Sequence, residues 1–227
     1  MIGTTGFEHK CSIAYDPPEV LAKAPPMSSN AQSHIHRAAM KLFSEHGAMQ
    51  VSVTELAQAA GVARGTIYNN LDDLAGLFDV VALELSLEIN ARVVRATSRL
   101  DDPIRRLAAG VRLYILSATR DPEVGRFLIR FGLSAEALRQ LWTGQPLADL
   151  IAGRAQGSYD FTDGQINWVI ALISGAAIGV IACALERPEA EAEAGMDAAE
   201  RILLALGVSR EDARTHARAP LPPFEES

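Results

Sequence analysis

The sequence predicts an all-α protein, with a three-helix N-terminal domain followed by a larger helical domain and about nine helices in all. Apolar residues recur at helical spacing almost without interruption from Ser33 onward. β-branched residues never form an alternating run between turn signals, so we expect no sheet. Capping residues, first-turn prolines and terminal glycines mark where the helices begin and end.

The composition predicts a soluble chain with a sizeable core. Its 227 residues are 48% hydrophobic, with a net charge of −7 and a pI of about 5.3. This balance argues against a protein that coats nucleic acid by charge alone, although it permits a local basic surface. Cys11 and Cys183 have neither metal-ligand nor redox spacing, which favours a reducing compartment. The first thirty residues lack a basic start followed by an apolar run, so we expect a cytoplasmic protein.

Four stretches organise the chain. Residues 1–32 contain four prolines and no helical or strand period, which predicts a disordered arm. Residues 33–80 and 81–207 form the two helical domains, and 208–227 is expected to be a flexible tail. The expected helices cover 33–46, 53–60, 64–70 and 72–99, then one opening at 103, then 122–131, 134–154, one opening at 166, and 196–206.

Residues 51–71, VSVTELAQAAGVARGTIYNNL, predict a helix-turn-helix. Ser52 and Glu55 form a capping box that opens the first short helix, and Gly61 ends it. The second helix, ARGTIYNN, can enter a DNA major groove. A small shared core comes from Leu56, Val62 and Ile67.

The second helix offers groups that suit DNA recognition. Arg64, Asn69 and Asn70 can donate hydrogen bonds to base edges. Thr66 and Tyr68 can reach phosphates or a thymine methyl group. These five side chains lie within two helical turns, so the pattern favours a double-stranded DNA partner.

Residues 33–80 resemble the DNA-binding domain of the TetR family of transcriptional repressors. The rest of the chain is similar to that family in layout, as a divergent helical domain after a long connecting helix. The matching positions are Ala39, Leu42, Phe43, His46, Gly47, Val53, Leu56, Ala57, Ala60, Gly61, Val62, Gly65, Thr66, Ile67, Tyr68, Leu71, Leu77 and Phe78.

The resemblance implies a two-fold homodimer that represses transcription from a palindromic operator. A small-molecule effector bound in the second domain would spread the two DNA-binding domains and release the DNA. The residues expected to contact DNA are Ser52, Thr54, Arg64, Gly65, Thr66, Tyr68, Asn69 and Asn70.

The chain departs from the family pattern at the start of the fourth helix. Leu71 stands where a phenylalanine is usual, and Leu74 stands where a lysine commonly touches a DNA phosphate. Residues 33–80 carry a net charge of −2, because they contain three cationic and five anionic side chains. DNA affinity depends strongly on phosphate neutralisation. The alternative hypothesis is therefore a module that kept the fold, binds a small molecule or a protein, and lost its DNA.

Residues 166–185, INWVIALISGAAIGVIACAL, are uncharged and as long as a membrane span. The flanks are acidic, and no Lys/Arg cluster or aromatic belt borders the stretch, which argues against a span. A helix that is apolar all round favours burial on both sides, so we expect a dimer helix, with a membrane tether and a plain core helix as alternatives. The expected interface residues are Trp168, Leu172, Gly175, Ala176, Gly179 and Ala182.

The resemblance also implies a ligand pocket between the fourth and seventh helices, where low charge favours an apolar or mildly polar effector. No nucleophile is spaced for catalysis and no histidines share a helix face, so we expect no enzyme, no cofactor and no metal. The candidate pocket residues are Asn90, Val94, Val111, Tyr114, Phe127, Phe131 and Trp142.

Overall fold

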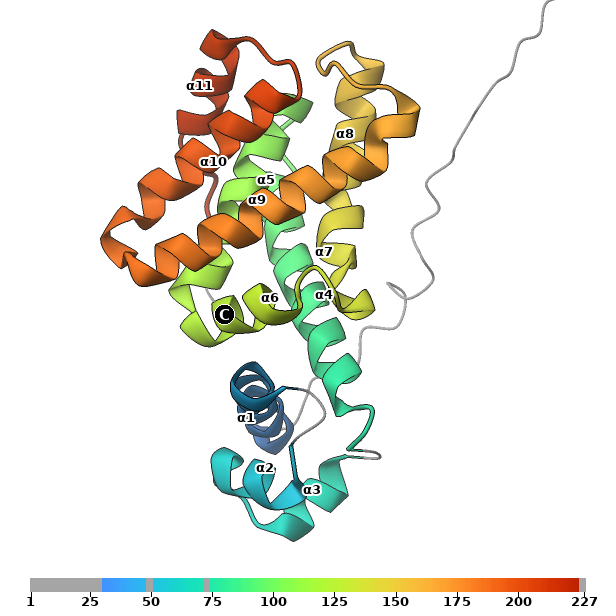
Figure 1. Cartoon of the computed structure of the whole chain (residues 1–227), viewed down its shortest axis with the longest axis vertical. Coiled ribbons are helices and arrows are strands. Elements are labelled where there is room, and N and C mark those ends of the chain that lie inside the picture. Colours follow the sequence, from blue (N-terminus) through green and yellow to red (C-terminus); the bar gives the residue numbers. More distant parts are fainter. Residues whose placement is uncertain (1–29, 48–50, 72–73, 225–227) are drawn as a thin grey trace, which may run out of the picture.

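The computed structural model describes residues 30–47, 51–71 and 74–224, and every regular element among them is a helix. A small N-terminal domain lies below a larger helical C-terminal domain, and α4 joins the two (Figure 1). The N-terminal domain consists of α1 (Asn30–His46), α2 (Val53–Ala60) and α3 (Arg64–Asn70). The remaining elements are α4 (Leu77–Thr97), α5 (Pro103–Arg120), α6 (Pro122–Phe131), η3 (Glu136–Leu138), α7 (Gln140–Thr143), α8 (Gln145–Ala155), η4 (Asp163–Gln165), α9 (Ile166–Glu186), η5 (Pro188–Ala190), α10 (Glu191–Ala205) and α11 (Arg210–Arg218).

Local capping residues set several helix ends where the sequence predicts them. The capping boxes of Ser52 with Glu55 and of Thr162 with Gln165 are both formed. The Asp102 side chain accepts from the Ile104 N–H at the start of α5. These contacts satisfy N–H groups that a helix leaves without an intrahelical partner. The bounds of α2, α3 and α6 are those that the sequence predicts.

The C-terminal residues correct the prediction of a flexible tail over 208–227. Ser209 caps α11, and Ala213 and Ala217 are buried where α11 packs against α10 and α5. Small alanines on one face allow this close packing although α11 is otherwise strongly polar. The prediction of a flexible tail is based on Pro220, Pro222 and Pro223. All three lie after α11, so they do not interrupt the helix.

Four other boundaries differ from the prediction. Helix α4 begins at Leu77 rather than at 72, and a turn over 74–76 precedes it. Helix α1 begins at Asn30, so the last residues of the predicted 1–32 arm are helical; residues 1–29 lie outside the described residues, as do Asp72 and Asp73. The expected helix over 134–154 is divided into η3, α7 and α8, because the backbone at Gly144 leaves helical geometry. Helix α10 begins at Glu191, five residues early, with acidic residues in the first turn, where the helix dipole favours them.

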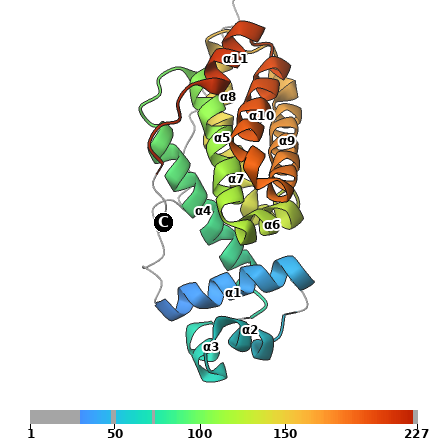
Figure 2. The ribbon, with the colours of Figure 1, turned by 90° about the vertical axis from the view of Figure 1, so that its left-hand side faces the viewer.

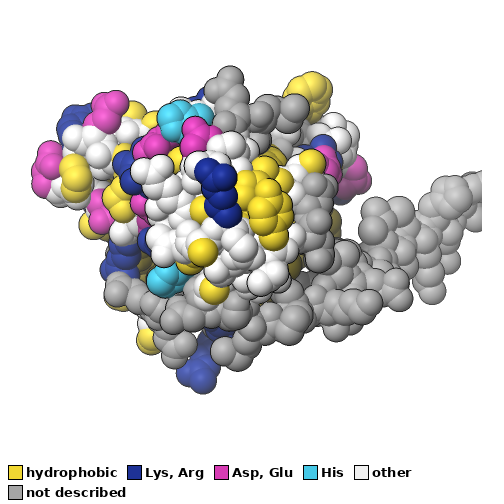
Figure 3. Space-filling model, turned by 90° about the horizontal axis from the view of Figure 1, so that it is seen from below, with side chains coloured by type: hydrophobic (Ala, Val, Ile, Leu, Met, Phe, Trp, Pro, Cys, Tyr) yellow, Lys and Arg dark blue, Asp and Glu magenta, His cyan; other side chains and the backbone are white. Residues whose placement is uncertain are grey.

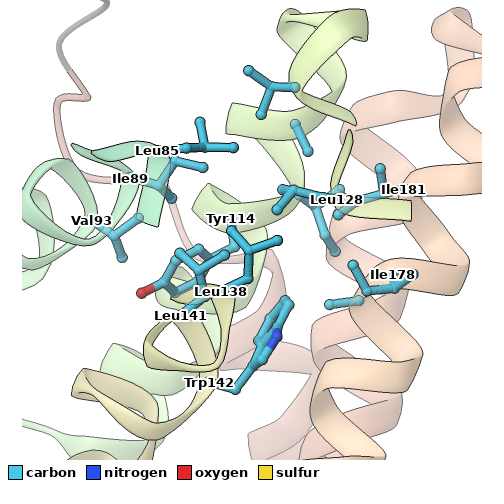
Figure 4. Packing of buried hydrophobic residues seen from close by; sticks show 14 of the residues in the cluster. Leu85, Ile89, Val93, Tyr114, Leu128, Leu138, Leu141, Trp142, Ile178 and Ile181 are labelled. Carbon is cyan, nitrogen blue, oxygen red and sulfur yellow. The ribbon is translucent and has the colours of Figure 1, made fainter. Parts of the chain in front are cut away.

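Helix α5 is the centre of the C-terminal domain, and α4, α6, α8, α9, α10 and α11 all pack against it. Figure 4 shows the apolar side chains that meet there, with Leu85, Ile89 and Val93 from α4 and Tyr114 from α5. Leu138, Leu141 and Trp142 approach from the broken segment, and Leu128, Ile178 and Ile181 from α6 and α9.

An aromatic cluster joins the two domains. The Phe78 ring of α4 lies 5.4 Å from that of Phe43 in α1 and 4.9 Å from that of Phe131 in α6, both edge-on. Phe127 completes the cluster, with its ring centroid 5.7 Å from that of Phe78. Edge-on aromatic pairs contribute about 0.5–1.5 kcal/mol beyond area burial. The N-terminal domain is therefore packed against both α4 and α6.

Candidate DNA interface and effector pocket

The turn between α2 and α3 depends on one glycine. Gly61 adopts a left-handed backbone with φ of 66°, and its N–H donates to the carbonyls of Ala57 and Gln58. A residue with a Cβ is strained in this conformation. The turn brings Leu56 of α2 and Ile67 of α3 into one buried core with α1. The helix-turn-helix predicted over 51–71 is thereby formed.

The free side of α3 carries the side chains predicted to read DNA. Arg64 and Asn69 are exposed, and 69% of the Tyr68 surface is accessible. Gly65 has no atom within 4 Å of where a Cβ would lie, so the backbone there is open to a close approach. Figure 3 looks onto this end of the molecule, where basic and hydrophobic side chains lie next to each other near the centre of the view.

Other predicted DNA contacts are partly engaged within the protein. Asn70 is half-buried, and its side-chain nitrogen donates to the Thr66 carbonyl across 2.8 Å. The Ser52 hydroxyl donates to Glu55 Oε2 and accepts from the Glu55 N–H. Glu55 Oε2 accepts from both the Ser52 hydroxyl and the Ser52 N–H, and these two hydrogen bonds lower the pKa of the Glu55 carboxyl. Thr54 is exposed and Thr66 is half-buried.

A buried cavity of about 10 Å³ lies inside the C-terminal domain, between α4, α5, α7, α8 and α9. That volume is about what one water molecule needs, so any larger ligand requires the surrounding helices to move. The cavity is lined by Val93, Thr97, Arg106, Leu107, Gly110, Val111, Tyr114, Trp142, Gln145, Pro146, Asp149, Ile173 and Ala177.

A polar cluster forms one side of this cavity. Asp149 is buried, and its Oδ1 accepts hydrogen bonds from Arg106 Nε and from Gln145 Nε2. Burial raises the pKa of the Asp149 carboxyl, although the hydrogen bonds from Arg106 and Gln145 oppose that shift. Burial also raises the pKa of Tyr114, whose hydroxyl donates to Asn90 Oδ1. The cavity therefore presents fixed donors and acceptors beside an apolar wall.

The structure brings only some of the predicted pocket residues to the cavity. Val111, Tyr114 and Trp142 line it, and Asn90 contacts it through Tyr114. The prediction that Val94 lines the pocket is wrong, because 38% of its surface is exposed on α4. The prediction is also wrong for Phe127 and Phe131, because both belong to the aromatic cluster between the domains and do not line the cavity.

The sequence prediction misses Arg106, Gln145 and Asp149. One signal was available: Asp149 is a carboxylate among the apolar residues of PLADLIAG, and buried carboxylates require partners. Its partner Arg106 lies 43 residues earlier in the chain, so the pairing depends on the tertiary fold.

One side of α9 is apolar and uncovered. Helices α9 and α10 lie side by side along one face of the C-terminal domain (Figure 2). Trp168 is 75% exposed and Leu172 is 48% exposed. Farther along the same stripe, neither Gly175 nor Gly179 has any atom within 4 Å of the place that a Cβ would take. Ala176 and Ala182 border the stripe and are half-buried. A surface of this kind typically contacts another protein.

These features define a class of protein. An N-terminal helix-turn-helix with an exposed second helix is joined, through α4, to a helical domain that contains a cavity and an uncovered apolar helix. This is the architecture of a DNA-binding regulator with a separate regulatory domain.

Comparison with known families agrees with that class. Residues 35–79 match the family described as bacterial regulatory proteins, tetR family, and residues 102–219 match the tetracyclin repressor-like C-terminal domain. The second match alone covers more than half of the chain. The chain belongs to the TetR family of transcriptional regulators.

Individual relatives are more distant. The chain is 31% identical over 109 residues to the HTH-type transcriptional regulator AcrR of Shigella flexneri, and this match covers 45% of the chain and 47% of AcrR. It thus spans about half the length of that curated relative. Ligand-free RolR has a TM-score of 0.64 at 24% identity, over 85% of this chain and all of RolR. SmeT, the repressor of a Stenotrophomonas maltophilia multidrug efflux pump, has a TM-score of 0.59 at 19% identity, over 79% and 90%. At these identities the two structures establish a shared fold.

Proposed function

We propose that this protein is a transcriptional repressor that binds a palindromic operator as a homodimer and is released by a small molecule. The exposed face of α3 supports this proposal, because it presents a guanidinium, a phenol and an amide to solvent. The second helix of a helix-turn-helix is the one that enters the major groove. In this proposal Arg64, Asn69 and Thr66 contact bases, while Thr54, Gly65 and Tyr68 contact the backbone. Ser52 and Asn70 support the geometry of the two helices through their internal hydrogen bonds.

The homodimer is proposed from the apolar stripe of α9. A membrane tether is the competing hypothesis, because Asp163–Glu186 is long and apolar enough to cross a bilayer. In the single chain, 39% of the most apolar window of this segment is buried. The exposure is confined to one side, whereas the other side packs against α5, α6 and α10. The glycines of this stripe suit a close helix pair, and the acidic flanks without a Lys/Arg cluster argue against a membrane span. We therefore place a second copy of the chain on this face, in the cytoplasm.

The effector site is proposed to be the buried cavity around Tyr114 and Trp142. RolR has been solved in complex with resorcinol and SmeT in complex with triclosan, so relatives with this fold hold small phenolic compounds. Here Asp149 and Arg106 add a polar side to an otherwise apolar cavity. We infer that the effector is a small, mainly apolar molecule with a hydroxyl or similar polar group. Because the cavity must expand to admit it, binding would shift α4 and the attached N-terminal domain.

Operator selection tests this function directly. The purified chain is mixed with a randomised DNA library, and bound sequences are recovered over several rounds at a fixed salt concentration. The proposal expects an enriched palindrome with half-sites about one helical turn apart. Light scattering is expected to give a mass twice the 24.3 kDa of the chain. Failure to enrich any sequence would contradict DNA recognition.

A second candidate function is a ligand-binding module without DNA. The acidic balance of residues 33–80 favours it, because that stretch contains three cationic and five anionic side chains. In that case the chain would still be a dimer and would still bind a small phenol, yet selection would yield no enriched palindrome.

A further inference from the structure

The chain continues beyond α11 as a segment that runs beside α4 (Figure 2). This segment, residues 219–224, has the sequence APLPPF. Proline holds φ at about −65°, so a proline-rich segment loses little conformational freedom when it packs. Leu221 and Phe224 are half-buried against the hydrophobic core. The segment is therefore a packed part of the fold.

The start of the segment is anchored to α10 and α5. Arg218, the last residue of α11, pairs with Asp197 at 3.0 Å and with Glu200 at 3.6 Å, both in α10. Arg112 of α5 is half-buried, and its Nη1 donates to the Ala219 carbonyl across 2.6 Å. A hydrogen bond from a charged donor is stronger than one between neutral groups. The segment thus begins at a fixed point on α5.

The far end of the segment contacts α4. The Phe224 ring lies against Arg92, with the guanidinium carbon 5.7 Å from the ring centroid. A cation at this distance from an aromatic ring is attracted to it. Arg92 also pairs with Glu88 one turn earlier, at 3.7 Å, so its guanidinium is held on the surface of α4. Pro222 and Pro223 line a hollow together with the last turns of α4.

The two helices that the segment joins are walls of the buried cavity. Val93 of α4 and Val111 of α5 both line the cavity. Arg92 and Arg112 are the immediate neighbours of these two residues in the chain, so their side chains point about 100° round each helix from the cavity. Enlarging the cavity would move α4 away from α5. This movement would separate the two points that the segment joins.

We propose that residues 219–224 are a strap that holds α4 against α5 and so opposes enlargement of the buried cavity. The consequence for an effector rests on the proposed function, whereas the restraint on α4 does not. A protein whose binding-competent state is rarely populated binds its ligand more weakly by that fraction. Release of the strap is therefore expected to strengthen binding in the cavity, although it removes stabilising contacts.

The first test measures hydrogen exchange of the full-length protein by mass spectrometry, which reports local opening. Phe224→Ala removes the ring from Arg92, and Arg112→Gln removes the guanidinium that holds Ala219. Phe161→Ala is the matched control, because Phe161 is another half-buried ring and stacks on Tyr159 rather than on α4.

Both strap variants are expected to exchange about tenfold faster over residues 85–100, as for one lost contact with a charged group. Exchange over α10 is expected to remain unchanged in them, and Phe161→Ala is expected to leave residues 85–100 unchanged. Equal acceleration of α4 and α10 would overturn the proposal, because the segment would then only stabilise the whole fold. No acceleration of α4 in either strap variant would also overturn it.

The second test titrates resorcinol, a small phenol, into the same proteins and measures its affinity by calorimetry. The strap variants are expected to bind it about tenfold more tightly than the unsubstituted protein, by the same factor as the opening of α4. Equal or weaker binding in the strap variants would overturn the proposal. Absence of resorcinol binding in every protein, with α4 exchanging faster as expected, would instead contradict the cavity as a phenol site and support the strap.

Discussion

Arg130 in α6 donates a hydrogen bond from Nη1 to the main-chain oxygen of Ser44 across 2.8 Å, and so holds the last turn of α1. The same nitrogen lies 3.3 Å from the Glu45 oxygen. A cation at the C-terminus of a helix is favoured by the helix dipole. Near the other end of α6, Asp121 pairs with Arg37 of α1. Helix α6 is therefore fastened to the N-terminal domain at two points, in addition to the link through α4.

Arg130→Ala is expected to lower the free energy of unfolding by about 1 kcal/mol, the net value of one hydrogen bond. Arg126→Ala is the matched control, because Arg126 is exposed on the same helix. Urea denaturation monitored by circular dichroism measures both. Equal losses in the two variants would show that the contact with α1 does not contribute.

Arg64→Ala is expected to weaken binding to the selected operator by about 1–3 kcal/mol and to relax the preference at one base pair. The reason is that Arg64 is exposed at the start of α3, where helix-turn-helix residues contact base edges. Fluorescence anisotropy with labelled operator measures the affinity. Arg210→Ala, on the exposed start of α11, tests for a general loss of positive charge. The base-reading role would be wrong if both variants lost the same affinity at every sequence.

Gly179→Leu is expected to dissociate the proposed dimer without unfolding the chain. No atom of the same chain lies within 4 Å of the added Cβ, and glycine is a poor helix former, so the monomer tolerates the change. In a close helix pair the larger side chain costs about 1–3 kcal/mol per copy. Light scattering across a concentration series measures dissociation. Gly164→Leu, equally unobstructed but outside α9, is expected to remain dimeric; a stable Gly179→Leu dimer would place the interface elsewhere.

Much of the fold follows from local sequence. The bounds of α2 depend on Ser52 and Gly61, and those of α6 on Asp121 and Pro122, all of which act within a few residues. The exposed face of α3 is predictable for the same reason, because helical spacing decides which side chains share a face with Arg64.

The pocket is less predictable because its residues meet through tertiary packing. Phe127 and Phe131 are large rings in the expected part of the chain, yet they pack on Phe78 rather than on the cavity. Helical spacing alone cannot choose between those two neighbours. The pairing of Asp149 with Arg106 likewise requires α8 to lie beside α5.

Asp149→Asn tests the electrostatics of the cavity through pH. Burial raises the pKa of Asp149 in the folded protein above the value of about 3.9 in an unfolded chain. The folded state therefore binds this proton more tightly, and the stabilising contribution is full below about pH 3.9 and lost as pH rises through the folded pKa. Asparagine does not titrate. The free energy of unfolding of the unsubstituted protein, relative to Asp149→Asn, is thus expected to fall as pH increases.

Urea denaturation of both proteins at several pH values, from just below the unfolded pKa of about 3.9 upward, measures this difference. Arg106 also donates to the Leu100 carbonyl at 2.6 Å, so it keeps one hydrogen-bond partner in Asp149→Asn. We therefore expect the variant to fold, which allows its free energy of unfolding to be compared with that of the unsubstituted protein. A difference that grows with pH would mean that the Arg106 pair outweighs desolvation. The Asp149 carboxylate would then be a stable anion on the cavity wall, and the favoured effectors would be hydrogen-bond donors or cations rather than neutral acceptors.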